Sequence, residues 1–141
     1  MTQVQFYHLK TTSIEAVLFF TVRLVEKIFD AKQTVCILAH TPNLLEPLDG
    51  LLWTALPRRF LAHDLLTTNT VSTSPICLAL PTTQPPHAQV VINLSEDLPS
   101  HRPLRIIELL WEQELVKQKA RKRYSAYQQQ KLPLQYLELN Q

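Results

Sequence analysis

The sequence predicts an α/β fold, a three-layer αβα domain with a central mixed, mostly parallel sheet. Short apolar runs with strand character alternate with longer segments in which apolar residues recur at helical spacing, and this alternation is typical of α/β domains. The length of 141 residues suits one domain with its own core. Because there is no internal repeat and no sign of a second domain, we expect residues 1–141 to fold as one unit.

The amino-terminal part begins with a strand, a helix and a second strand. Residues 4–9 (VQFYHL) are apolar and rich in aromatic residues, as strands are. Thr12 and Glu15 have the spacing of a capping box, and apolar residues at helical spacing then predict a helix over 14–29. Residues 34–39 (TVCILA) have the apolar character of a buried parallel strand.

A second helix is predicted from residue 42 to about residue 55. Thr41 provides the cap, and the proline that follows it suits the first helical turn. Pro47 and Gly50 weaken this helix, so we expect a kink or a restart near Glu46.

The carboxyl-terminal half supplies further strands and the last helix. The segment RRFLAHDLL contains a short extended piece, and residues 76–80 and 89–94 are strands. The connection between the last two is too short for a helical crossover, which predicts an antiparallel pair and hence a mixed sheet. Residues 105–110 (RIIELL) fit either a strand or a helix. Their β-branched pair favours a strand, followed by a helix from about Glu112 to Gln130.

Composition excludes several classes of protein. Gly50 is the only glycine, and a phosphate-binding loop needs several, which argues against P-loop NTPases and dinucleotide-binding enzymes. The longest apolar run is too short and too charged to span a bilayer, and no signal peptide is visible, so we expect a cytoplasmic protein. Cys36 and Cys77 lie in apolar strands and are predicted to be buried reduced thiols. No catalytic or metal-binding spacing occurs, so neither an enzyme by itself, nor a cofactor, nor a metal is expected.

A basic segment stands near the carboxyl end of a chain whose net charge is only +2. On a helix, Lys117, Arg121 and Tyr124 fall on one stripe, and Leu110 of the preceding strand lies beside the first turn. Such a site could hold a short peptide that ends in an acid and a bulky ring. Two alternatives remain, a solvated helix face and direct binding of single-stranded nucleic acid. The neighbouring stripe, which we expect to face the sheet, consists of Val116, Ala120, Arg123 and Tyr127.

A second candidate site surrounds Trp53 and Phe60, two large rings in a segment rich in turn formers. Large aromatic side chains are frequent anchors of protein interfaces, and they are also frequent in cores. The sequence pattern alone favours the core and leaves the interface open.

Three parts of the chain carry a resemblance to a known family. They are FYHL near the start, LLW followed by RRFLAHDL, and ARKRYSAYQQQKLPLQYLE near the end. Their order and spacing, across nearly the whole chain, resemble the chi subunit of bacterial DNA polymerase III. The most specific parts are Trp-x6-Phe followed by AHDL, and the block ARxRYxAY.

The resemblance implies a non-catalytic accessory subunit of the clamp-loader assembly, within a DNA-directed DNA polymerase complex that replicates DNA. It also implies two partners: the psi subunit, which tethers chi to the clamp loader, and the acidic carboxyl-terminal tail of single-stranded DNA-binding protein. The implied fold is similar to nucleotide-binding folds without the phosphate loop, and the single glycine agrees with it.

Carried over position by position, the resemblance assigns Trp53 and Phe60 to a patch that binds psi. One departure concerns Ser125, because family members can have a basic residue directly after the tyrosine at this place. The departure affects the outer half of the contact with the tail. The implied tail pocket consists of Leu110, Lys117, Arg121 and Tyr124.

Overall fold

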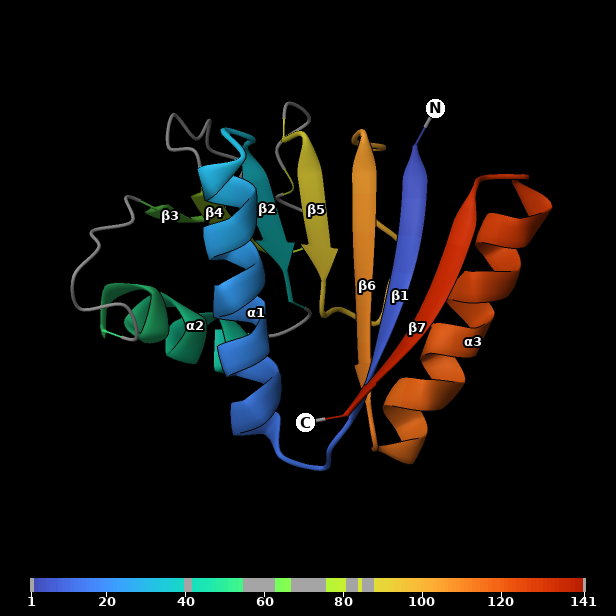
Figure 1. Cartoon of the computed structure of the whole chain (residues 1–141), viewed down its shortest axis with the longest axis horizontal. Helices are drawn as coiled ribbons and strands as arrows, with labels where there is room; N and C mark the ends of the chain where they lie inside the picture. Colours follow the sequence, from blue (N-terminus) through green and yellow to red (C-terminus); the bar gives the residue numbers. More distant parts are fainter. Residues whose placement is uncertain are drawn as a thin grey trace.

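The structure, a computed structural model, describes residues 2–39, 42–54, 63–66, 76–80, 84 and 88–140. Within them, seven strands form one sheet in the order β3-β4-β2-β5-β6-β1-β7 (Figure 1). The strands are β1 (Gln3–Lys10), β2 (Val35–Leu38), β3 (His63–Leu66), β4 (Ile76–Ala79), β5 (Val90–Asn93), β6 (Arg105–Trp111) and β7 (Leu134–Asn140). The helices are α1 (Ile14–Asp30), α2 (Pro42–Thr54) and α3 (Glu114–Gln129).

The helices form a layer on each face of the sheet. Figure 1 shows α1 and α2 beside the half of the sheet that contains β2, β4 and β5, and α3 beside β7 and β1. The alternation of side chains along β1 separates the two faces, because Phe6 belongs to the core under α3 and Leu9 to the core under α1. The predicted three-layer α/β fold is therefore confirmed.

The predicted mixed sheet is wrong, because every pairing among the described strands is parallel. A short connection indicates an antiparallel pair only when the two strands are neighbours. Here β2 lies between β4 and β5 and pairs with both of them in parallel. All residues of these three strands are buried, as expected for interior strands of a parallel sheet.

The structure contains an edge strand that the sequence analysis does not predict. β7 follows α3 and pairs in parallel with β1, which brings Tyr136 opposite Phe6 and Glu138 opposite His8. The connection turns through Lys131, whose φ is 57°, in the left-handed region. This turn lets the chain reverse directly from the end of α3 into the sheet.

The amino-terminal cap of α1 differs from the prediction. The N-cap is Ser13, whose hydroxyl accepts a hydrogen bond from the backbone N–H of Ala16 at 3.2 Å. The capping box predicted at Thr12 and Glu15 is therefore displaced by one residue, because the serine hydroxyl reaches the first turn directly.

The helix α2 begins at Pro42, in agreement with the prediction, and is continuous to Thr54. A restart near Glu46 does not occur in this range, although Pro47 lies inside the helix, and the alternative, a kink, stays a prediction. Leu48 and Leu52 are fully buried one turn apart, and their packing against the core offsets the loss of one backbone hydrogen bond.

A buried polar cluster attaches α3 to the sheet. Glu108 of β6 is fully buried and accepts hydrogen bonds from Arg123 Nε at 3.0 Å, the Tyr127 hydroxyl at 2.6 Å and Asn93 Nδ2 at 3.0 Å. Burial raises the pKa of Glu108, and its three donors offset part of that rise. The sheet-facing stripe is confirmed, since Arg123 and Tyr127 are buried together with Ala120.

Cys36 and Cys77 face each other across β2 and β4 as buried free thiols, as the sequence predicts. Cys77 and burial raise the pKa of the Cys36 thiol. Among the helices of the described ranges, none is both long enough and apolar enough to cross a membrane.

Candidate functional site

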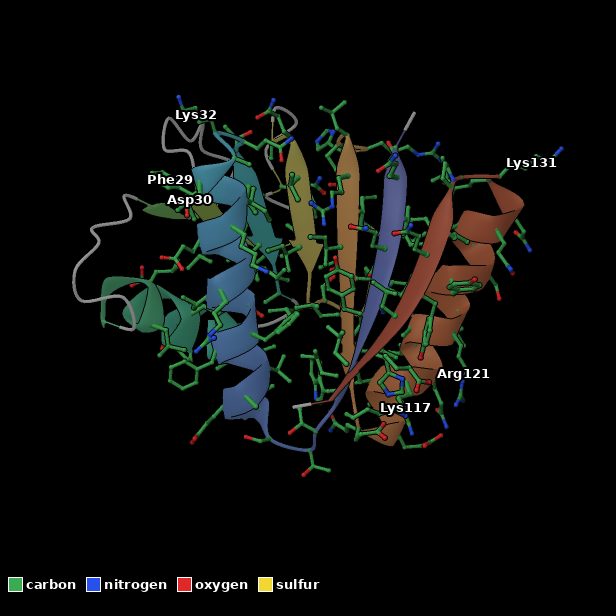
Figure 2. The ribbon with its side chains drawn as sticks, in the orientation of Figure 1. Phe29, Asp30, Lys32, Lys117, Arg121 and Lys131 are labelled. Atoms are coloured by element: carbon green, nitrogen blue, oxygen red, sulfur yellow. The ribbon has the colours of Figure 1, made fainter. Side chains whose placement is uncertain are left out.

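A cavity of about 420 Å³ lies between α3 and the strands β1, β6 and β7. The four residues predicted for a peptide pocket all line it: Leu110 from β6, and Lys117, Arg121 and Tyr124 from α3. Figure 2 shows Lys117 and Arg121 on the half of α3 that follows β6. The cavity therefore lies toward the carboxyl ends of the strands, where open α/β sheets commonly bind ligands.

Aromatic rings form the apolar wall of the cavity. The ring centroid of Phe6 is 5.2 Å from that of Tyr124 and 6.5 Å from that of Tyr136, and the two tyrosine rings are 6.4 Å apart. Leu110 and Ala120 line the same cavity and are buried, so they extend the apolar surface toward the core. A flat ring of a ligand could pack edge to face here.

The two predicted cations differ in how they are paired. Lys117 Nζ lies 3.3 Å from Glu112 Oε2, so an internal carboxylate already neutralises part of its charge. Arg121 is exposed, and no ion pair joins it to any residue in the part of the chain that the structure describes. A carboxylate that binds here could therefore pair with Arg121 directly, whereas it would have to share Lys117 with Glu112.

A chain of polar groups closes one side of the cavity. The Tyr136 hydroxyl lies 2.6 Å from Nδ1 of His8, and Nε2 of His8 lies 2.9 Å from Glu112 Oε2. The bond from His8, followed by Lys117 and Lys10, lowers the pKa of Glu112, whereas partial burial raises the pKa of Tyr136. All contacts are satisfied if the tyrosine donates to Nδ1 and Nε2–H donates to the carboxylate.

This arrangement suits binding of an anionic group attached to an apolar one. The cations stand at the mouth of an apolar cavity, and a merely solvated helix face would not need such a cavity. Within the described residues, no group of three or more His, Cys, Asp or Glu side chains is placed to hold a metal ion.

Sequence reasoning misses three lining residues: Phe6, His8 and Tyr136. Phe6 and His8 are two residues apart in the predicted first strand, so their side chains lie on the same face. Nothing in the sequence indicates that α3 packs on that face. Tyr136 is missed because β7 is missed. Ser125 also lines the cavity, which places the departure from the family pattern at the site itself.

The second predicted site falls largely outside the described residues. Trp53 belongs to α2 by its backbone, but its side chain is not described, and Phe60 lies outside the described residues. The patch predicted around these two rings therefore stays a prediction.

Comparison with known proteins gives two matches. The family model described as DNA polymerase III chi subunit, HolC, matches residues 1–135. A curated relative, the DNA polymerase III subunit chi of Pseudomonas aeruginosa, is 30% identical over 137 residues, covering 96% of this chain and 95% of the relative.

Proposed function

Because the chain belongs to the DNA polymerase III chi subunit family, we propose that it acts in DNA replication as a non-catalytic bridge. One face would bind the psi subunit and through it the clamp loader. The other would bind the acidic carboxyl-terminal tail of single-stranded DNA-binding protein. As a subunit of a replication complex it would work in the cytoplasm, where it meets DNA indirectly, through the coated strand.

The observation that carries the proposal is the convergence of Leu110, Lys117, Arg121 and Tyr124 on one cavity with an apolar wall and a cationic mouth. A tail that ends in a bulky ring and a free carboxylate matches both halves of this surface. The ring would enter between Phe6, Tyr124 and Tyr136, and the carboxylate would meet Arg121 and share Lys117 with Glu112.

A single contact of this kind should be weak, because a flexible peptide loses entropy when it becomes ordered. We expect a Kd on the order of micromolar, and we expect binding to weaken with added salt, since the attraction lies at the surface. Many tails on one coated strand would then hold the complex by avidity.

The test of the tail pocket is a calorimetric titration with an acidic peptide ending in phenylalanine. Arg121→Ala should weaken binding about tenfold or more, because it removes the unpaired cation. Lys122→Ala is the matched control, since Lys122 is an exposed cation on the same helix that does not line the cavity. Equal affinity in wild type and Arg121→Ala would remove the pocket assignment.

The test of the psi contact is co-purification. We expect Trp53→Ala and Phe60→Ala to abolish recovery of psi while tail binding persists, because aromatic anchors dominate such interfaces. Loss of tail binding in the same variants, together with a lower melting temperature, would instead identify the two rings as core residues.

Direct binding of single-stranded nucleic acid through α3 is the second candidate. The basic composition of the helix favours it, but two of its cations are engaged: Lys119 Nζ lies 2.5 Å from Glu96 Oε2, and Arg123 is buried against Glu108. Fewer free cations leave fewer phosphate contacts. Strong retention of a naked single strand in a gel shift, without any partner protein, would favour this candidate over the bridge.

A further inference from the structure

A second and larger cavity lies on the opposite face of the sheet. Its volume is about 870 Å³, and it runs between α1 and the strands β1, β6 and β7. The apolar floor consists of Ile107 from β6, Tyr7 from β1, and Leu137 and Leu139 from β7. We call this surface the α1 groove.

The α1 groove leaves apolar side chains in contact with solvent. Leu137 on its floor is 45% exposed, and Phe19 on its α1 wall is 48% exposed. α1 stands beside β2 in Figure 1, whereas β7 is the edge strand at the other side of the sheet. Among the elements that the structure describes, no helix therefore covers the outer strands on this face as α3 does on the other.

The charge of the α1 groove has one sign. Arg23 and Lys27 line the α1 side, Arg105 lines the sheet side, and none of the described residues that line the cavity is acidic. Arg105 donates to Gln5 and Tyr7, which are uncharged acceptors, so its charge is not neutralised. Arg23 and Lys27 are exposed and form no ion pair within the described ranges.

We propose that the α1 groove docks an amphipathic helix of a partner protein, with an apolar stripe flanked by acidic residues. A helix is about 10 Å in diameter, and in layered domains helices are the elements that pack on the face of a sheet. The apolar floor would receive the apolar stripe, and the three unneutralised cations would meet the acidic flanks. This surface is separate from the tail pocket, which lies on the other face.

The probe is a synthetic amphipathic helix of 17 residues, the length of α1, with leucines at helical spacing and glutamates on both sides of the stripe. Fluorescence anisotropy would measure its binding to the full chain. The double variant Arg23→Glu/Lys27→Glu should weaken binding about tenfold, because attraction becomes repulsion. A second peptide with lysine in place of glutamate should show the reverse preference and bind the double variant better.

The controls separate this proposal from the tail pocket. The double variant should keep its affinity for the acidic tail peptide, because both changed residues are exposed on the other face. Its melting temperature should fall only slightly, because Lys27 is the basic residue in the last turn of α1 and a glutamate is less favourable there. Loss of tail binding in Arg121→Ala should in turn leave the helix probe unaffected. The test of helix docking is therefore independent of the test of the tail pocket.

Three results would overturn the proposal. One is no binding of the acidic helix, or equal binding by wild type and the double variant. Another is binding of a single-stranded oligothymidylate that the double variant loses, which would assign the groove to nucleic acid. The third is a dimer in sedimentation equilibrium that Leu137→Asp dissociates, which would assign it to a second copy of this chain.

Discussion

The strands β6, β1 and β7 present two faces whose polar groups are satisfied in different ways. On the α3 face, Glu108 and Arg123 form a buried ion pair with further donors around it. On the α1 face, Arg105 donates to Gln5, which donates in turn to Gln135, in a row that remains partly open to solvent. The same three strands therefore carry one closed network and one open row.

The difference shows which charges find a partner within the described part of the chain and which do not. The buried charges of the α3 face are complementary within the chain, and they hold α3 in the position that shapes the cavity proposed to bind the tail. On the α1 face, the charged residues that line the groove within the described ranges are all positive, and this supports the proposed docking of an acidic helix. Alternation along a strand is enough to separate the two roles.

The largest expected effect is on stability and comes from the α3 face. Arg123→Ala leaves Glu108 buried without its cation and should lower the free energy of unfolding by about 3–5 kcal/mol. Arg105→Ala, the matched change on the α1 face, should cost about 1 kcal/mol or less, because its hydrogen bonds are to uncharged groups in a partly exposed row. Urea unfolding of both variants measures the contrast.

The pH dependence of Arg123→Ala follows from Glu108. Burial raises the pKa of this carboxyl in the folded protein, so ionising it lowers stability as pH rises above the pKa of the unfolded chain. Without Arg123 the folded pKa should rise further, so the deficit of the variant should be smallest near pH 4 and should widen toward neutral pH. A deficit that is constant with pH would show that lost packing, and not lost charge pairing, causes it.

The sequence predicts which side of α3 faces the sheet, but not which residue pairs with Arg123. Helical periodicity places Lys117, Arg121 and Tyr124 on one stripe and Arg123 on the next, and the structure agrees. The partner of Arg123 could not be predicted, because Glu108 lies on another element and its role depends on the register between β6 and α3.

The sheet shows the same limit. Most strands can be recognised by their apolar runs, but their order in the sheet cannot be predicted in this way. β2 lies between β4 and β5, and this order depends on contacts between segments far apart in the sequence. β7 (LQYLELN) is not predicted because polar residues interrupt its apolar ones. An edge strand tolerates such a sequence, because half of its residues can face solvent. Without β7, neither Tyr136 in the tail pocket nor Leu137 in the α1 groove could be placed.

A smaller effect is expected from Glu112, the acid beside the proposed tail pocket. Glu112→Gln removes the carboxylate that neutralises part of Lys117 and that would repel an acidic tail. The tail peptide should bind about two- to fivefold more tightly in calorimetry, because the amide can still accept from His8 but carries no charge. Weaker binding would show instead that Glu112 positions Lys117 for the tail and does not compete with it.

An effect of similar size, on stability, is expected from the turn that follows each of two helices. α1 and α3 are each followed, two residues after their last residue, by a lysine in the left-handed region, Lys32 at φ 61° and Lys131 at φ 57°, and Figure 2 shows both at the same end of the molecule. In both, backbone bonds satisfy the last carbonyls, and glycine is the residue that adopts this conformation without strain. Lys131→Gly and Lys32→Gly should each raise the free energy of unfolding by about 0.5–1 kcal/mol, roughly 2–4 °C in melting temperature.

Lys→Ala at the same positions, which removes the charge but keeps the Cβ, should give no gain. A clear gain at Lys32 but none at Lys131 would mean that the end of α3 is fixed by the buried pair and not by its cap.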